Sequence, residues 1–155
     1  MNRTKLLKRI ETAWLGLKES YGGLSAPELI VPGVAGEWSV KDIIAHVTCW
    51  EEETLAHLPL ILAGGTPPRY SVRYGGIDAF NQLMTNQRRK LSLQEILGQR
   101  DAVHARVLDF VRVIPEEQIA TETRLRRRLR LDTYGHYAKH SLSIRNWRAH
   151  RSQGK

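Results

Sequence analysis

The sequence contains a single cysteine, Cys49, and no long apolar run. One cysteine excludes a framework of disulfides within the chain. The longest apolar stretch, around residues 58–63, contains Pro59 and is far shorter than the roughly 20 residues of a membrane-spanning helix. No segment combines a basic start, an apolar middle and a small-residue cleavage site. We therefore expect a cytoplasmic protein that makes no contact with a membrane.

Internal repeats and low-complexity segments are also missing, and acidic residues are in the minority. The chain has 24 Lys and Arg against 16 Asp and Glu, a formal charge of +8. Its 155 residues are enough for one domain with its own core, so we predict a single domain over residues 1–155. The positive charge attracts nucleic acid, anionic lipid or acidic small molecules without selecting among them.

Much of the excess charge lies in residues 124–130, where five arginines are interrupted by two leucines. Nucleic-acid binders usually combine basic residues with a groove-reading motif or with stacking aromatic side chains. Leucine takes the place of aromatic residues between these arginines. We therefore expect no nucleic-acid partner. The run is either a solvated connector or the mouth of a pocket for an anionic small molecule.

Apolar residues recur at spacings of three and four, which predicts an all-α protein: a four-helix bundle with long crossover connections. Ser39 and Asp42 form a capping box at the start of the second helix. Leu125, Leu129 and Leu131 suggest a short extended edge within residues 116–131. The four helical regions are residues 4–21, residue 39 to residue 59 or 64, residues 78–114 as one kinked helix or two, and residue 132 or 133 to residue 147.

Three histidines are candidate metal ligands. His136 and His140 are separated by four positions on the last helix, and this spacing lets two imidazoles bind one metal ion. His46 falls within the apolar stripe of the second helix, with Ile43 and Val47, and therefore faces inward. Three imidazoles from two helices, with open positions left over, are typical of a catalytic metal site. The alternative is three core histidines with separate partners.

Zinc or nickel suits three nitrogen ligands best, with iron and manganese as alternatives. The catalytic residue is not identified, and two weaker candidates are Glu53 and Tyr137. Glu53 lies two helical turns beyond His46 and is able to orient a ligand or accept a proton, unless it is simply a solvated acid. Tyr137 follows His136 and is able to donate to an oxyanion, unless it is a packed ring. We expect His104 at the surface.

Residues 38–51, WSVKDIIAHVTCWE, resemble the second-helix signature of the DinB-like superfamily of bacterial four-helix bundles. Residues 76–82, the capped third helix and the pair His136-Tyr137 are similar to the branch named after the colibactin self-protection protein ClbS and its DfsB relatives. In many members of the superfamily one histidine of the second helix and two of the last helix hold a metal. The resemblance therefore implies a metal site made of His46, His136 and His140.

The resemblance also implies a function, as a metal-dependent hydrolase or thiol transferase that acts on a small-molecule substrate in detoxification or stress response. Two alternatives remain open. ClbS is associated with hydrolysis of a reactive electrophile without a metal, so one alternative is a metal-free self-protection hydrolase. The other is a non-catalytic, ligand-binding stress-response module. The presence of His140 completes the metal-binding set. Bundles of this kind often pair, which makes a homodimer a reasonable expectation.

Overall fold

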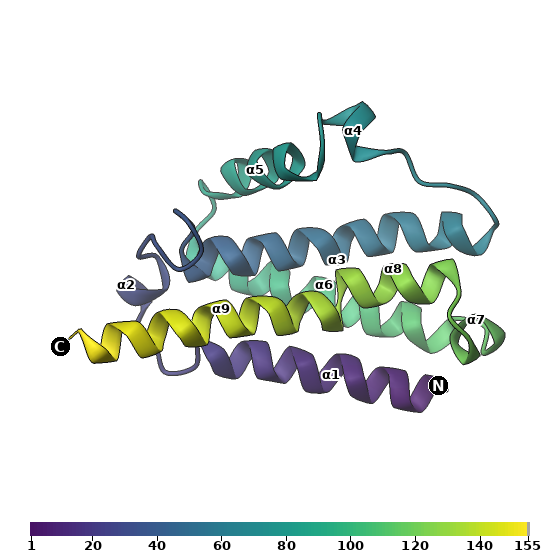
Figure 1. Cartoon of the computed structure of the whole chain (residues 1–155), viewed down its shortest axis with the longest axis horizontal. Helices are drawn as coiled ribbons and strands as arrows, with labels where there is room; N and C mark the ends of the chain where they lie inside the picture. Colours follow the sequence, from purple (N-terminus) through teal and green to yellow (C-terminus); the bar gives the residue numbers. More distant parts are fainter. Residues whose placement is uncertain (155) are drawn as a thin grey trace.

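The computed structural model describes residues 1–154, and four long helical runs form its bundle (Figure 1). The fourth run is interrupted, so that two consecutive helices share it. α1 packs against α6 and α9, while α3 packs against α6 and α8. The predicted all-α four-helix bundle is therefore confirmed. The runs are α1 (Arg3–Ser20), α3 (Val40–Leu62), α6 (Leu93–Val113), and α8 (Arg124–Asp132) followed by α9 (Tyr134–Gln153).

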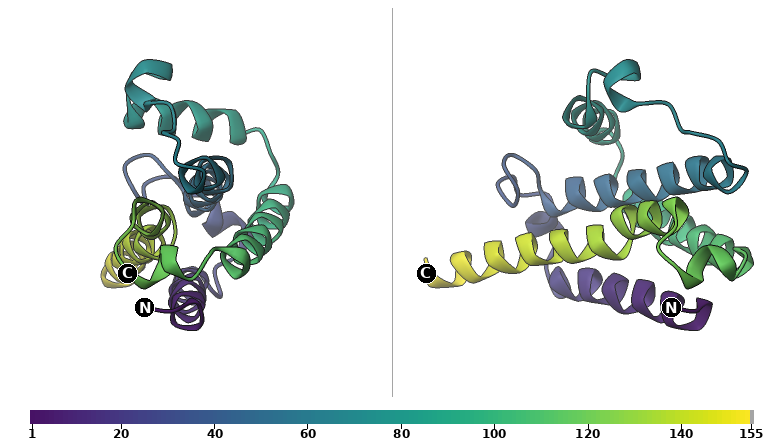
Figure 2. Two further views of the ribbon diagram at one scale, coloured as in Figure 1. Left: turned by 90° about the vertical axis from the view of Figure 1, so that its right-hand side faces the viewer. Right: turned by 45° about the vertical axis from the view of Figure 1, so that its right-hand side comes forward.

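Short helices fill the crossovers. α2 (Ala26–Leu29) lies between α1 and α3, and α7 (Glu117–Ala120) lies between α6 and α8. α4 (Tyr70–Arg73) and α5 (Ile77–Arg88) belong to the long crossover and lie outside the bundle, over α3 (Figure 2). The predicted third region is thus two helices, α5 and α6.

The extended edge predicted within residues 116–131 is wrong. Most of that segment is helical, as α7 and α8. Leu125 and Leu129 are four positions apart on α8, and both are fully buried, at 1% and 0% exposure. The spacing of these two leucines is a helical one, and burial of this face stabilises a helix that its arginines would not stabilise alone.

Capping boxes fix the starts of two bundle helices. Ser39 and Asp42 form the predicted box at the start of α3, and Ser92 and Glu95 form another at the start of α6. α3 is in contact with α5, α6, α8 and α9, which explains why it is buried on most of its faces. A histidine on α3 is therefore enclosed whether it faces α8 and α9 or the crossover.

The junction between α8 and α9 sets the direction of the last helix. Thr133 leaves the helical conformation, with φ −122° and ψ −105°, and its hydroxyl donates to the carbonyl oxygen of Leu129 instead of capping α9. At Gly135, a Cβ atom would lie 2.9 Å from the carbonyl oxygen of Arg130. Only glycine allows this close approach without a shift of the backbone. The junction therefore controls where α9 carries its histidines.

Apolar side chains from all the bundle helices form the main core. A smaller cluster of Cys49, Trp50 and Phe80 packs with Tyr70 and Tyr74, and it joins α3 to the α4–α5 crossover. Within residues 1–154, no helix is both long enough and apolar enough to cross a lipid bilayer. The crossover is thus attached to the bundle by aromatic rings beside the position of His46.

Candidate metal centre and its pocket

The three predicted histidines come together between α3 and α9. His136 Nε2 lies 2.9 Å from His46 Nε2 and 2.9 Å from His140 Nε2. One nitrogen from each ring can be chosen so that all three lie within 4.8 Å of one another. His46 and His140 are buried, at 6% and 7% exposure. The ring of Trp38 packs on His46 with centroids 4.8 Å apart.

Hydrogen bonds among the three rings do not satisfy all of their nitrogens. A neutral imidazole nitrogen carries either one proton or one lone pair, so His136 Nε2 cannot make a full bond to both neighbours. The Nδ1 atoms of His136 and His140 are buried, and neither has a hydrogen-bond partner in the described part of the chain. A cation shared by the three rings would use the facing lone pairs together. The donor set therefore fits a divalent metal that prefers nitrogen ligands.

Burial keeps these rings neutral. It is the main cause that lowers the pKa of His46 to about 3, of His136 to about 2 and of His140 to about 4, and the positive charge of Lys139 adds to the effect. A neutral imidazole has the free lone pair that a metal ligand needs. The three side chains are thus in the correct protonation state at neutral pH.

Cys49 and His57 do not extend the ligand set. Cys49 is buried in the small aromatic cluster, and burial raises the pKa of its thiol to about 12, so it is not a thiolate ligand. His57 Nδ1 lies 3.2 Å from Arg128 Nη2. That contact directs the His57 ring toward α8 instead of the trio.

A pocket of about 350 Å³ opens beside the trio. Two of the histidines form part of its wall, and Trp50 and Tyr70 form another part. The guanidinium of Arg128 lies over both aromatic rings, 5.8 Å from the Trp50 centroid and 5.9 Å from the Tyr70 centroid. The lining residues are His46, Trp50, Tyr70, Ile77, Asn81, Arg128, Leu131, Asp132, His136 and Lys139.

A larger hollow of about 590 Å³ lies at the start of α3, away from the histidines. Two of its four charged residues, Asp42 and Arg89, form an ion pair, with 3.5 Å between the carboxylate and guanidinium atoms. Its lining contains no histidine and no cysteine, so it offers no metal-ligand set comparable with the trio. The smaller pocket is therefore the candidate site.

An ion pair and two hydrogen bonds hold the side chains at the rim of this pocket in place. Arg128 forms an ion pair with Asp132 and donates to the Tyr70 hydroxyl at 2.8 Å. The Tyr70 hydroxyl in turn donates to Glu53 Oε1 at 3.2 Å. Glu53, predicted as a weak catalytic candidate, thus holds Tyr70 and is not among the residues that line the pocket.

Tyr137, the other weak candidate, lies in the core. It is fully buried, and its hydroxyl donates to Glu51 Oε2 at 3.0 Å. The same oxygen lies 2.8 Å from His104 Nδ1, and the His104 ring stacks on Trp14 with centroids 3.8 Å apart. The surface position predicted for His104 is therefore wrong, because a buried acid and an aromatic face provide partners for its ring.

The bundle and the inward-facing trio define a class of helical proteins with a candidate metal centre between two facing helices. The profile of the DinB superfamily matches residues 5–142. The chain therefore belongs to the DinB superfamily, as its resemblance predicted. Among curated proteins, none is similar enough to this chain to count as a match.

Several solved structures share the fold at low sequence identity. DfsB, described as a sibling lethal factor precursor, has 19% identity and a TM-score of 0.81, with 97% of each chain covered. An uncharacterised protein from Escherichia coli UTI89 has 14% identity and a TM-score of 0.80, with 97% of this chain and 95% of that chain covered. The colibactin self-resistance protein ClbS, in complex with a double-stranded DNA, has 14% identity and a TM-score of 0.78, with 94% of each chain covered.

The ClbS complex corrects one prediction. We expected no nucleic-acid partner because aromatic residues do not interrupt the arginines of residues 124–130. A protein of the same fold has nevertheless been crystallised with duplex DNA. The expectation was wrong because contacts to a phosphate backbone need positive charge and no stacking aromatic side chain.

Most of the other pocket residues were missed from the sequence, among them Asn81, Asp132 and Lys139. Lys139 follows His136 by three positions, so its place on the same side of α9 was available as a signal. Asn81 comes from α5, and nothing in its local sequence indicates that α5 lies over α3. The local sequence predicts that Asp132 caps the last helix, whereas in the structure Asp132 forms an ion pair with Arg128.

Proposed function

We propose that the chain is a metal-dependent enzyme that acts on a small molecule, with His46, His136 and His140 as the metal ligands. The observation that carries this proposal is the convergence of three neutral imidazoles, of which His46 and His140 are buried and His46 and His136 line a 350 Å³ pocket. A structural metal site usually has four protein ligands, whereas three ligands next to a pocket leave positions open for a substrate.

A divalent ion held there would supply Lewis-acid chemistry, polarising an electrophile and making a thiol or a water molecule more acidic. The residues of the chain bind and orient the substrate. Trp50 and Tyr70 offer flat apolar faces, and Arg128 holds them in place. Cys49 stays protonated, so thiol transfer requires a thiol that arrives as a second substrate. Hydrolysis and thiol transfer are the two reaction classes that family membership supports.

Metal analysis of untagged protein tests the ligand set. We expect close to one equivalent of zinc or nickel in the wild type and in His150→Ala, whose ring is exposed on the same helix. We expect loss of that metal in His140→Ala. Absence of metal from all three proteins would contradict the proposal.

A turnover screen then separates the candidate functions. The probes are 4-nitrophenyl acetate for hydrolysis and 1-chloro-2,4-dinitrobenzene with a low-molecular-weight thiol for thiol transfer. Turnover that falls in His140→Ala supports the metal-dependent enzyme. Turnover of equal rate in His140→Ala supports a metal-free hydrolase, and bound metal without turnover supports a ligand-binding module.

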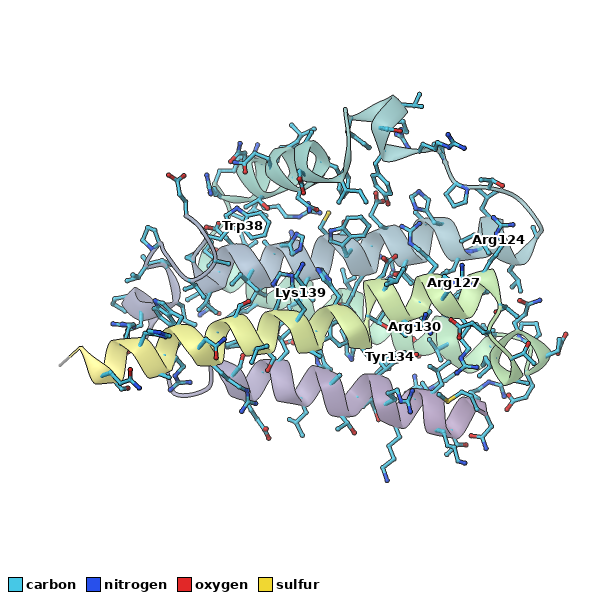
Figure 3. All side chains as sticks on the ribbon, viewed as in Figure 1. Trp38, Arg124, Arg127, Arg130, Tyr134 and Lys139 are labelled. Atoms are coloured by element: carbon cyan, nitrogen blue, oxygen red, sulfur yellow. The ribbon has the colours of Figure 1, made fainter. Side chains whose placement is uncertain are left out.

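We also propose, as a second candidate function, binding of duplex nucleic acid along α8. Arg124 and Arg127 are exposed on that helix, and Figure 3 shows them with Arg130 on the face turned toward the viewer. Arg130 is paired with Glu122 at 2.6 Å. Arg127 has no ion-pair partner in residues 1–154. Its charge is therefore available to a phosphate, as the ClbS complex with double-stranded DNA suggests for this fold.

Fluorescence anisotropy with a labelled 20-base-pair duplex tests this second function. We expect the double variant Arg124→Ala/Arg127→Ala to bind about tenfold more weakly, since two phosphate contacts are lost. The matched control is Arg106→Ala/Arg112→Ala, which removes the same charge from α6. Equal weakening in both double variants would show that net charge alone attracts the duplex.

A further inference from the structure

Lys139 is a cation without a counter-charge at the edge of the pocket. It lies on α9, one turn beyond His136. Its side chain is exposed to solvent and forms part of the lining of the pocket. In the part of the chain that the structure describes, no carboxylate lies within ion-pair distance of its ammonium group. Its charge is near enough to the trio to lower the pKa of all three histidines. An ammonium group in this position attracts an anion that enters the pocket.

Arg128 does not serve the same purpose, although it lines the same pocket. Its guanidinium is paired with Asp132, bonded to Tyr70 and close to His57. The charge is thus compensated within the protein, and the guanidinium is held over the rings of Trp50 and Tyr70. Of the five arginines in residues 124–130, only Arg128 lines the pocket. Recognition of an anionic substrate therefore does not come from the arginine run.

Asn81 adds neutral donors on the opposite helix. The indole N–H of Trp50 donates to Asn81 Oδ1 at 2.9 Å. Because an indole nitrogen is able only to donate, this bond fixes which end of the amide is oxygen and leaves the Nδ2 group as the free donor. Asn81 Nδ2 has no partner among the described residues. Two sets of donors, on α5 and α9, are therefore unused at one pocket.

The rest of the pocket is apolar and aromatic. Ile77 and Leu131 are exposed by 52% and 60%, and both line the pocket beside Trp50. Exposed large apolar side chains at a pocket indicate a ligand with an apolar body. The pocket thus offers unused donors, one of them charged, together with apolar walls.

We infer that the pocket takes a small organic anion with an apolar body, whose carboxylate or similar oxyanion is held by Lys139 and Asn81. This inference rests on the proposed function, because it assigns the substrate class of the same site. Lys139 is a specificity residue, which selects charged substrates over neutral ones of the same shape. The apolar body lies against Trp50, Ile77 and Leu131.

Paired probes that differ only in charge test this inference. 2-Naphthoate and 2-naphthamide share one aromatic body, and their affinities are measured by isothermal titration with chelator-treated and with zinc-loaded protein. We expect naphthoate to bind about tenfold more tightly than naphthamide in both forms, as one charge-assisted contact allows. Lys139→Gln should remove this difference and Lys139→Arg should keep it. Lys90→Gln, at an exposed lysine outside the pocket, should not change it.

Comparison of chelator-treated with zinc-loaded protein distinguishes failure of this inference from failure of the proposed metal site. A naphthoate preference that depends on Lys139 in chelator-treated protein supports the inference even if zinc never binds. A preference that occurs only with zinc and is unchanged in Lys139→Gln would overturn the inference, and it would leave the metal proposal standing. Equal binding of the two probes in both forms would also overturn it.

Discussion

The hydroxyl of Tyr137 donates to Glu51 Oε2 across 3.0 Å, and this bond joins α9 to α3 inside the core. Both residues are fully buried, and His104 lies on the same carboxylate oxygen at 2.8 Å. Burial raises the pKa of Glu51, and the bonds from His104 and Tyr137 oppose that rise. Since His136 precedes Tyr137, the bond fixes the position of α9 relative to α3 next to the candidate ligands.

Removal of this bond should loosen the metal site. We expect Tyr137→Phe to lower the free energy of unfolding by about 1–2 kcal/mol, because a buried hydrogen bond is lost. We also expect zinc affinity to fall about tenfold, the lower end of the effect seen for residues that orient metal ligands. Urea titration and zinc titration measure the two effects. Tyr74→Phe is the control, because the Tyr74 hydroxyl has no hydrogen bond within residues 1–154. Wild-type zinc affinity in Tyr137→Phe would contradict this role.

Gly135 should resist substitution because of the backbone that faces it. An added Cβ would lie 2.9 Å from the carbonyl oxygen of Arg130, so Gly135→Ala must shift the start of α9. We expect a loss of about 1–3 kcal/mol in stability, typical of overpacking, together with weaker zinc binding. Gly98→Ala on α6 is the control, since its Cβ meets no atom within 4 Å. Thermal unfolding of both variants should show Gly98→Ala equal to or more stable than the wild type.

Asp132 should make stability depend on pH. Burial raises the pKa of Asp132 from 3.8 to about 6, and the Arg128 guanidinium opposes that rise. The folded protein therefore holds the proton more tightly than the unfolded chain does. Protonation of Asp132 therefore adds to the free energy of unfolding. This stabilisation is fully present below pH 3.8 and is lost as the pH rises through 6.

The matching measurement compares the wild type with Asp132→Asn by urea unfolding between pH 3.5 and pH 7. Because other titrating groups are common to both proteins, the difference in their unfolding free energies isolates Asp132. We expect the wild type to lose about 2–3 kcal/mol relative to the variant over this range. A difference that is constant with pH, or that changes in the opposite direction, would contradict the assigned pKa.

The bundle could be predicted from the sequence because its signals are local. Ser39 and Asp42 mark the start of α3, and apolar residues at spacings of three and four mark the helices that pack together. Helix periodicity placed His46 on an inward face and His136 and His140 on one face of the last helix, and the resemblance to the DinB-like superfamily implied that the three meet. That these three bind a metal stays a prediction until it is measured.

The other features of the site depend on tertiary contacts that no local pattern contains. Glu51 lies in a run of three glutamates, and only the packing of α6 and α9 onto α3 distinguishes it as buried. The absence of any described counter-charge for Lys139 and the orientation of Asn81 depend on which helices neighbour them. Leu125 and Leu129 were assigned to an extended edge because the arginines around them hid a helical spacing.

X-ray absorption at the metal edge of the purified protein tests the central claim most directly. We predict three imidazole nitrogens at about 2.0–2.1 Å from one zinc ion, and loss of one imidazole, or of the metal itself, in each of His46→Ala, His136→Ala and His140→Ala. A spectrum with oxygen or sulfur ligands alone, or one that is unchanged in the three variants, would contradict the claim that these histidines hold the metal.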